Sequence, residues 1–95
     1  MINYELLLII NPTVDDAEKE ATVETVKRII ETDGQVSEVD IWGMKKLAYP
    51  IKKHLEGYYA IVNFKASPEL PKELDRRLKI SDNIIRHLII NKDEK

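Results

Sequence analysis

The sequence predicts an α+β domain in which two strand–helix–strand halves share one antiparallel sheet. Three observations support this fold class. The chain has 95 residues, which is the size of one domain. Its apolar residues follow strand-like and helix-like spacings in the order strand, helix, strand, strand, helix, strand. No linker or low-complexity segment divides residues 1–95. We therefore expect a single ferredoxin-like domain, the split βαβ sandwich, with a four-stranded antiparallel sheet and two helices on one face.

The first half begins with a strand over residues 2–10. The second part of this strand is apolar at every position, so we expect both of its faces to be covered, and a proline ends it. A helix is predicted over residues 13–33, with Thr13 or Asp15 as its N-cap and acidic residues in its first turn. Gly34 stands where a left-handed residue often ends a helix.

The second half begins with two strands and a connection. Residues 35–49 predict a long strand whose apolar register slips, which indicates a β-bulge, and Gly43 is a candidate for another. Residues 50–57 are mostly polar and predict the connection, with Gly57 as its turn glycine. Residues 58–65 predict the third strand because they are rich in aromatic and β-branched side chains.

A second helix and a fourth strand complete the chain. Ser67 is the expected helix cap, and a proline follows in the first turn. Leu70, Leu74 and Leu78 recur at the helical spacing and should form its buried stripe. Residues 84–91 predict the fourth strand.

Alternation along the strands assigns the two faces of the sheet. In the third strand, the set that includes Asn63 and Lys65 is the more polar, so we place it on the face without helices. The predicted open face then carries Leu7, Ile9, Tyr59, Ile61 and Ile89, with His87 nearby. An apolar patch of this kind indicates a protein partner. A register shifted by one residue would instead make the same side chains ordinary core.

The residues needed for most catalytic and metal chemistry are missing or scattered. The chain has no cysteine, and its three glycines are not clustered into a phosphate loop. His54 and His87 lie far apart and lack metal-ligand spacing. We therefore predict no enzyme activity, no cofactor, no metal and no small-molecule substrate. The apolar run at residues 6–10 is too short for a membrane span or a signal peptide, so we expect a cytoplasmic protein with no membrane partner.

Positive charge and aromatic rings concentrate in one stretch of a chain whose net charge is -2. Residues 42–59 hold four lysines and four of the six aromatic residues. Lysines here fit two interpretations equally: they neutralise phosphates, or they protect an edge strand from aggregation. The added rings favour binding. The first strand has no ring at its centre, so we do not expect RNA bases to stack on the sheet.

The same stretch resembles the signature of a known family. Residues 43–52, GMKKLAYPIK, are similar to the pattern Gly, any residue, a basic residue, a basic or polar residue, Leu, Ala or Ser, Tyr, any residue, Ile, then often a basic residue. This is the pattern of the bacterial small-subunit ribosomal protein numbered six. The resemblance covers nearly the whole chain and extends to Trp42, Gly57-Tyr58, Tyr4-Glu5, Asn11-Pro12, Ile80-Ser81-Asp82 and Ile85-Arg86-His87.

The resemblance implies a ribosome component that binds the central domain of 16S ribosomal RNA together with the small-subunit protein numbered eighteen. The residues that it marks for RNA contact are Tyr4, Lys45, Lys46, Tyr49, Lys52 and Arg86. Our face assignment marks Leu7, Tyr59, Ile61 and Ile89 for the protein partner. Two alternatives remain open from the residues alone. One is a homodimeric ferredoxin-like module that binds a ligand or regulates, and the weaker one is a hydrolase of small phosphate compounds.

Overall fold

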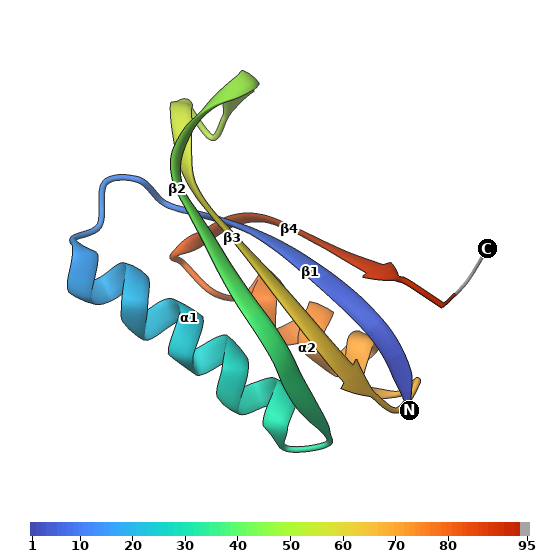
Figure 1. The fold of residues 1–95 in the computed structure, drawn as a ribbon. Helices are drawn as coiled ribbons and strands as arrows, with labels where there is room; N and C mark the ends of the chain where they lie inside the picture. Colours follow the sequence, from blue (N-terminus) through green and yellow to red (C-terminus); the bar gives the residue numbers. More distant parts are fainter. Residues whose placement is uncertain (94–95) are drawn as a thin grey trace.

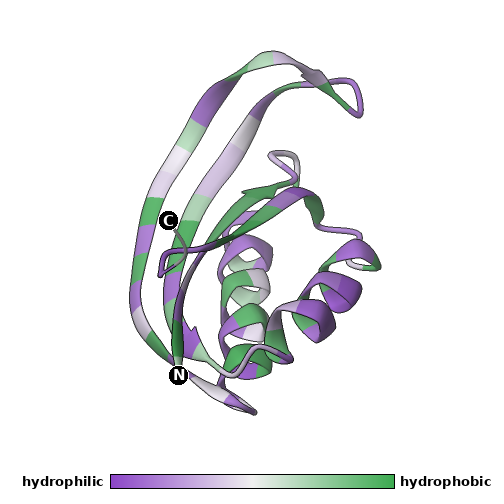
Figure 2. Ribbon diagram, turned by 90° about the vertical axis from the view of Figure 1, so that its right-hand side faces the viewer, coloured by the Kyte–Doolittle hydropathy of each residue, from purple (hydrophilic) through white to green (hydrophobic). Residues whose placement is uncertain are grey.

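The computed structural model describes residues 1–93 and has one four-stranded antiparallel sheet in the order β2-β3-β1-β4. Both helices cover the same side of this sheet (Figure 2), and the strands lie in front of α2 in Figure 1. The predicted order of elements and the ferredoxin-like sandwich are therefore confirmed. The elements are β1 (Ile2–Ile10), α1 (Asp16–Glu31), β2 (Gly34–Ile51), β3 (His54–Ala66), α2 (Leu70–Lys79) and β4 (Ile84–Asn91).

The core lies between the sheet and the two helices. Alternate residues of the central strands point into it, as the sequence predicted, and the leucine stripe of α2 closes it from the other side. The fully buried side chains include Leu6, Leu8, Ile10, Ala60, Val62, Val26, Ile30 and Leu74. Each buried aliphatic side chain stabilises such a core by roughly 1.5–3 kcal/mol relative to an exposed one.

Helix α1 begins at its predicted cap and ends without the predicted glycine. The Asp15 carboxylate accepts a hydrogen bond from the Glu18 backbone N–H at 2.8 Å. Thr32 follows the last helical residue, and Gly34 is already the first residue of β2. The prediction of a left-handed Gly34 is wrong. Glycine is required there for another reason, because a Cβ atom would lie 2.3 Å from the Lys65 carbonyl oxygen of β3.

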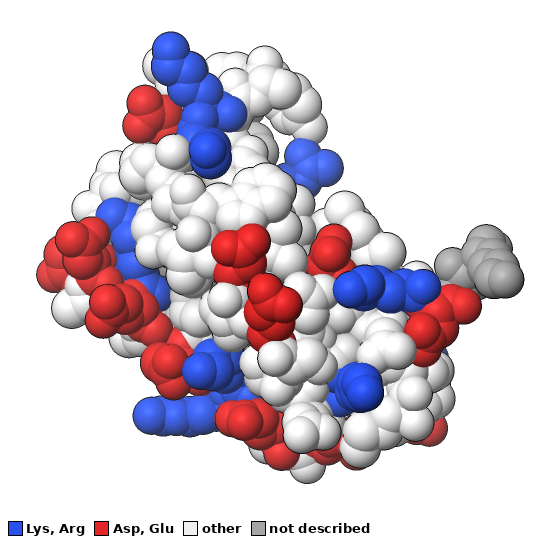
Figure 3. Space-filling view, viewed as in Figure 1, with Lys and Arg blue, Asp and Glu red and all other residues white. Residues whose placement is uncertain are grey.

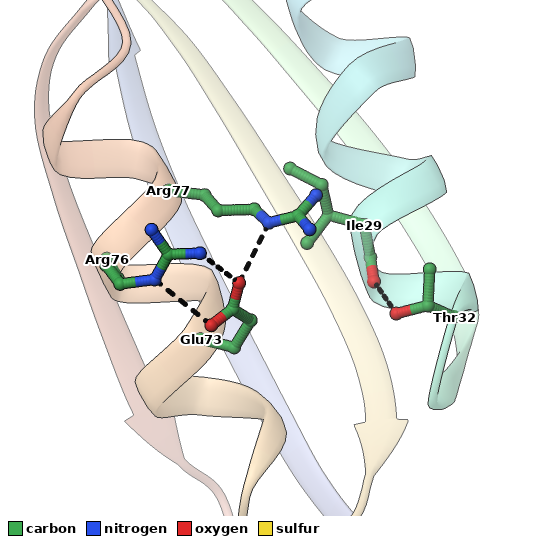
Figure 4. A network of polar contacts seen from close by, with 5 residues as sticks. All are labelled: Ile29, Thr32, Glu73, Arg76 and Arg77. Atoms are coloured by element: carbon green, nitrogen blue, oxygen red, sulfur yellow. Dashed lines mark hydrogen bonds and ion pairs between the residues drawn. The ribbon is translucent and has the colours of Figure 1, made fainter.

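Helix α2 begins later than predicted, at Leu70. The Leu70 N–H donates a hydrogen bond to the backbone carbonyl of Ser67 at 3.2 Å. The expected serine cap is wrong, because the Ser67 hydroxyl donates to the Asp33 carboxylate instead. Pro71 occupies the first turn of the helix, where its missing N–H leaves no helical hydrogen bond unmade. Figure 4 shows Glu73 accepting hydrogen bonds from Arg76 and Arg77, with Arg77 extending toward α1.

The β2–β3 hairpin is longer than the sequence predicted. The turn lies at Lys52 and Lys53, which both have left-handed backbone angles (φ 48° and 70°). The predicted connection over residues 50–57, with Gly57 in its turn, is therefore wrong. Gly57 lies inside β3 and is buried, and a Cβ atom there would meet the Ile9 Cγ2 atom at 2.3 Å.

Strand β2 departs from regular pairing three times. Its register with β3 shifts between Val36 and Glu38, between Ile41 and Gly43, and again toward the hairpin turn. Gly43 has a positive φ of 81°, which fits a bulge residue. The predicted bulges of this strand are confirmed. They increase its twist and bend it, so that its far end curves over in Figure 2.

Gly57 gives the first prediction, because its close approach to Ile9 leaves no room for a methyl group. We expect Gly57→Ala to lower the free energy of unfolding by about 1–3 kcal/mol through overpacking. Chemical denaturation measures this loss. In an Ile9→Leu background, which lacks the Cγ2 atom, the same substitution should be clearly less destabilising. An equal loss in both backgrounds would contradict the packing explanation.

Helix α2 is tied to β4 by a polar contact that titrates. The His87 ring nitrogen Nε2 lies 2.6 Å from the Asp75 carboxylate, and the Lys79 ammonium lies 3.0 Å from it. The hydrogen bond to His87, aided by Lys79, lowers the pKa of Asp75 below its usual value. A carboxyl group whose pKa is lower in the folded state stabilises the fold above its unfolded pKa of about 3.9. That contribution is lost as the pH falls through the folded pKa.

We therefore expect Asp75→Asn to destabilise the protein near neutral pH and to matter progressively less below about pH 4. Urea unfolding of both proteins at several pH values measures this difference. The exposed Asp82 offers a control, because Asp82→Asn should not reproduce the pH-dependent difference. A difference between Asp75→Asn and the unchanged protein that stays constant across this pH range would count against the proposed role of Asp75.

Candidate nucleic-acid and protein interface

Residues 44–56, which we call the hairpin arm, carry the basic cluster that the sequence marked. The arm extends beyond the ends of β1 and β4 at the top of Figure 1. Figure 3 shows Lys and Arg side chains gathered at the same place. Lys45 and Lys46 stand opposite Gly57 and Glu56 of β3 in consecutive pairs, so they point to opposite faces of the hairpin. The exposed lysines of the arm are Lys45, Lys46, Lys52 and Lys53.

The tip of the arm is formed by an unusual turn. Two-residue hairpin turns with positive φ at both central positions usually contain Asn or Gly, but here Lys52 and Lys53 adopt this conformation. A side chain with a Cβ atom makes a left-handed backbone less favourable by roughly 1–2 kcal/mol. Strain of this kind is retained at functional sites more often than elsewhere. The turn thereby places two positive charges at the outermost point of the arm.

The arm cations have no acidic partners in the described part of the chain. Within residues 1–93, Lys45, Lys46, Lys52 and Lys53 form no ion pair with a carboxylate. Several cations on the helices differ in this respect, because Lys19, Lys27, Arg76, Arg77 and Lys79 each pair with an acidic residue of their own helix. The positive charge of the arm is therefore available to an external anion.

Tyr49 and Arg86 connect the arm to β4. The Arg86 guanidinium donates a hydrogen bond to the Tyr49 hydroxyl at 2.8 Å, although 37 residues separate them in the chain. The Tyr49 ring is 59% exposed. The fold thus brings five of the six residues that the resemblance marked for RNA to one end of the molecule: Lys45, Lys46, Tyr49, Lys52 and Arg86.

Tyr4 does not belong to this group. Its side chain is only 6% exposed and its ring stacks on Phe64, with 5.4 Å between the ring centroids. The expectation that Tyr4 contacts RNA is therefore wrong for its ring, which is a core residue. The alternation that places Leu6 and Leu8 toward the helices also places Tyr4 there, and this signal was present in the sequence.

The open face of the sheet carries the predicted apolar residues of the central strands. Leu7 lies opposite Ile61, and Ile9 lies opposite Tyr59, on the side away from the helices. The Trp42 ring stacks on the Tyr59 ring with 6.5 Å between centroids and 7° between planes. The rows that cross this face are Asp40–Ile61–Leu7–Leu88, Glu38–Asn63–Glu5–Ile90 and Gly43–Tyr59–Ile9–Arg86.

The placement of Ile89 and His87 at this face is wrong. Ile89 lies opposite Leu6 and His87 lies opposite Leu8, so both side chains point toward the helices. Leu88 and Ile90 occupy the open face instead and are 49% and 42% exposed. The sequence could not decide between the two faces, because residues 84–90 have apolar side chains at both parities and a bulge in the β1–β4 pairing shifts the register.

Carboxylates border the apolar centre of the open face. Glu5 and Glu38 lie in the next row away from the arm, Asp40 lies at the β2 end of the Leu7 row, and Arg86 lies next to the arm. Lys65 and Lys92 stand beyond Glu5 and Glu38, where Lys92 contacts Asn63. Figure 3 shows acidic side chains, with some basic ones among them, below the basic top. The face therefore has an apolar centre with a basic arm on one side and mixed charges, led by Glu5 and Glu38, on the other.

A small hollow forms where the arm bends toward the sheet. Its volume is about 190 Å³, and its lining is mostly apolar. The residues around it include Leu7, Ile9, Leu47, Ile51, Tyr59, Arg86 and Leu88. The described part of the chain shows no group of three or more His, Cys, Asp or Glu side chains that could hold a metal. Among residues 1–93, no helix is long and apolar enough to cross a membrane.

Comparisons with known proteins agree with this arrangement. Residues 3–91 match the family model described as Ribosomal protein S6. A small ribosomal subunit protein bS6 of Clostridioides difficile is 51% identical, and the match covers 95% of this chain and 98% of that protein. The corresponding protein of Clostridium kluyveri is 52% identical, and the match covers both chains completely.

A solved structure gives the same result for the fold. The crystal structure of 30S ribosomal protein S6 from Thermotoga maritima superimposes with a TM-score of 0.93 at 36% identity. The match covers 97% of this chain and 88% of that one. With the family model and these relatives, it shows that the chain belongs to the ribosomal protein S6 family.

Proposed function

We propose that this chain binds the central domain of 16S ribosomal RNA together with the small-subunit protein numbered eighteen. The hairpin arm contacts the RNA, and the open face of the sheet contacts the protein. The chain is a structural component of the small ribosomal subunit in the cytoplasm and needs no catalytic group, cofactor or small-molecule substrate. The observation that carries this proposal is the basic arm, free of acidic partners among residues 1–93, beside an exposed apolar sheet face.

The RNA part rests on the availability of the arm cations. Lysine side chains that lack internal partners can neutralise phosphates and release counterions, which supplies most of the non-specific affinity for nucleic acids. Arg86 adds a planar guanidinium, which suits phosphate and base edges. Tyr49 adds an exposed ring beside it, and unstacked RNA bases stack on such rings.

The protein part rests on the apolar centre of the open face. Leu7, Tyr59 and Ile61 provide it, and Leu88 and Ile90 extend it to β4. We assign this surface to protein rather than RNA because the first strand offers no ring for base stacking and because carboxylates flank the apolar centre. Those carboxylates repel phosphates and attract a basic protein.

The contact between Arg86 and Tyr49 lies where the two surfaces meet. A protein docked on the open face would touch the row that ends at Arg86, and Arg86 holds the exposed Tyr49 ring of the arm. Docking would therefore restrict the arm before RNA arrives, and RNA would then bind a surface that has already lost part of its conformational freedom. This coupling supports interdependent binding of the protein and the RNA.

The proposal predicts how binding depends on salt. Removing the charges of Lys45, Lys46 and Lys52 together, by alanine substitution, should weaken binding to a central-domain RNA fragment. The slope of log K against log salt concentration should become less steep by about 0.7–0.9 for each phosphate that the variant no longer neutralises. Filter binding at several salt concentrations, with protein eighteen present, measures both quantities.

A control with the same net charge replaces three lysines of the helices, Lys27, Lys72 and Lys79, by alanine. This variant should keep nearly the original affinity and salt slope, because these side chains lie away from the arm. Equal reductions in both variants would show that only the total charge matters and would refute the role of the arm. The proposal as a whole fails if the unchanged chain shows no affinity for this RNA at low salt, alone or with protein eighteen.

A further inference from the structure

The two edges of the sheet differ in how they are protected. The β2 edge has three register shifts, two lysines in the arm and Pro50, all of which hinder the addition of another strand. The β4 edge is less protected, because its one register shift lies at its first residues. Residues Ile84–Asn91 contain no proline, glycine or lysine, and their pairing with β1 is regular from Asn91 to Arg86. An edge of this kind is a ready template for strand pairing.

The backbone of β4 offers hydrogen-bonding groups on its outer side. The Lys92 N–H donates to the Asn3 carbonyl at 2.8 Å, and this bond shows which backbone N–H and C=O groups of β4 are directed toward β1. Because these groups alternate along an antiparallel strand, Leu88 and Ile90 bond to β1. The N–H and C=O groups of His87 and Ile89 therefore point outward, where no further strand lies among the described residues.

Side chains on both sides of this edge suit an incoming strand. Leu88 and Ile90 are about half exposed on the open face, next to the edge. On the helix side, a shallow groove separates β4 from α2, and its lining includes Pro71, Asp75 and Ile89. An added strand would place alternate side chains beside Leu88 and Ile90 and the others in this groove.

We propose that an extended segment of the protein docked on the open face pairs with β4 as a fifth strand of the sheet. This inference rests on the proposed function, because it assigns a second contact to the same protein partner. The segment should be apolar at alternate positions. A basic residue of the segment opposite Ile90 would lie on the open face, in the same row as Glu5, which pairs with Ile90 from β1. β-Strand addition of this type supplies affinity through main-chain hydrogen bonds and specificity through alternate side chains.

The open face favours this partner over a second copy of the chain. A single pair of strands is marginally stable in water, so edge pairing needs additional buried area. Two copies joined edge to edge at β4 would set their open faces side by side and leave both uncovered. A protein that already lies on the open face supplies the additional buried area. Leu88 and Ile90 are continuous with the open face on which that protein lies.

Amide exchange tests the inference residue by residue. In the free chain, the amides of His87 and Ile89 should exchange quickly with deuterium, whereas those of Leu88 and Ile90 should be protected by β1. Adding protein eighteen should slow exchange at His87 and Ile89 by about tenfold or more. If the complex forms and these two amides still exchange quickly, the partner docks on the face alone and strand addition is refuted while the proposed function stands.

Two other outcomes also decide the question. If no complex forms, this inference and the proposed function fail together. If His87 and Ile89 are already protected in the free chain, and sedimentation shows a dimer, the edge belongs to a second copy and the assigned partner is wrong.

A matched pair of variants at Ile89 gives an independent measurement. Ile89→Pro removes the outward N–H without removing a hydrogen bond to β1, and Ile89→Ala causes a similar loss of packing while keeping the N–H. The proline variant should bind protein eighteen about tenfold more weakly than the alanine variant. Equal affinities would overturn the inference. Circular dichroism checks that both variants fold, and the exchange experiment on the unchanged chain decides the question if the proline variant does not.

Discussion

The position of β1 at the centre of the sheet is the constraint on which the rest of the structure depends. This strand pairs with β3 on one side and β4 on the other, and its even-numbered side chains fill the core beneath it. A strand that is apolar on both faces requires cover on both faces. The helices cover one of them, and the other is left with Leu7 exposed in part and Ile9 covered by its neighbours. The composition of one strand is thus the reason to propose a second layer on the open face.

The close contact between Gly57 and Ile9 links this central strand to the hairpin arm. Because residue 57 has no side chain, β3 passes next to Ile9 and the hairpin continues beyond the end of β1. The arm can then carry lysines outward while its base remains part of the sheet. A hydrogen bond between Arg86 and Tyr49 connects the arm to β4 as well, beside the apolar face.

The sequence predicted the elements with strong patterns and missed those that depend on pairing. The leucine stripe of α2 and the alternation of β3 each allow only one assignment of the buried side, and both predictions are confirmed. Gly57 looked like a turn residue, but Lys52 and Lys53 form the turn in a conformation that their side chains disfavour. The face of Ile89 depends on a bulge opposite the end of β1, and no local pattern in β4 reports it. The lysines of the arm could be found from the sequence, whereas the absence of ion pairs between them and the carboxylates of residues 1–93 needed the fold.

The net charge of -2 does not conflict with binding to RNA, because the fold separates the charges. Several acidic residues of α1 and α2 are neutralised within their own helices by lysines and arginines three or four residues away. Glu5 and Glu38 of the open face lie away from the arm, and their carboxylates repel phosphates. On the proposed function, this distribution directs RNA to the arm and leaves the apolar face to the protein partner. A uniformly basic domain of the same fold would bind RNA more strongly and would not distinguish between the two surfaces.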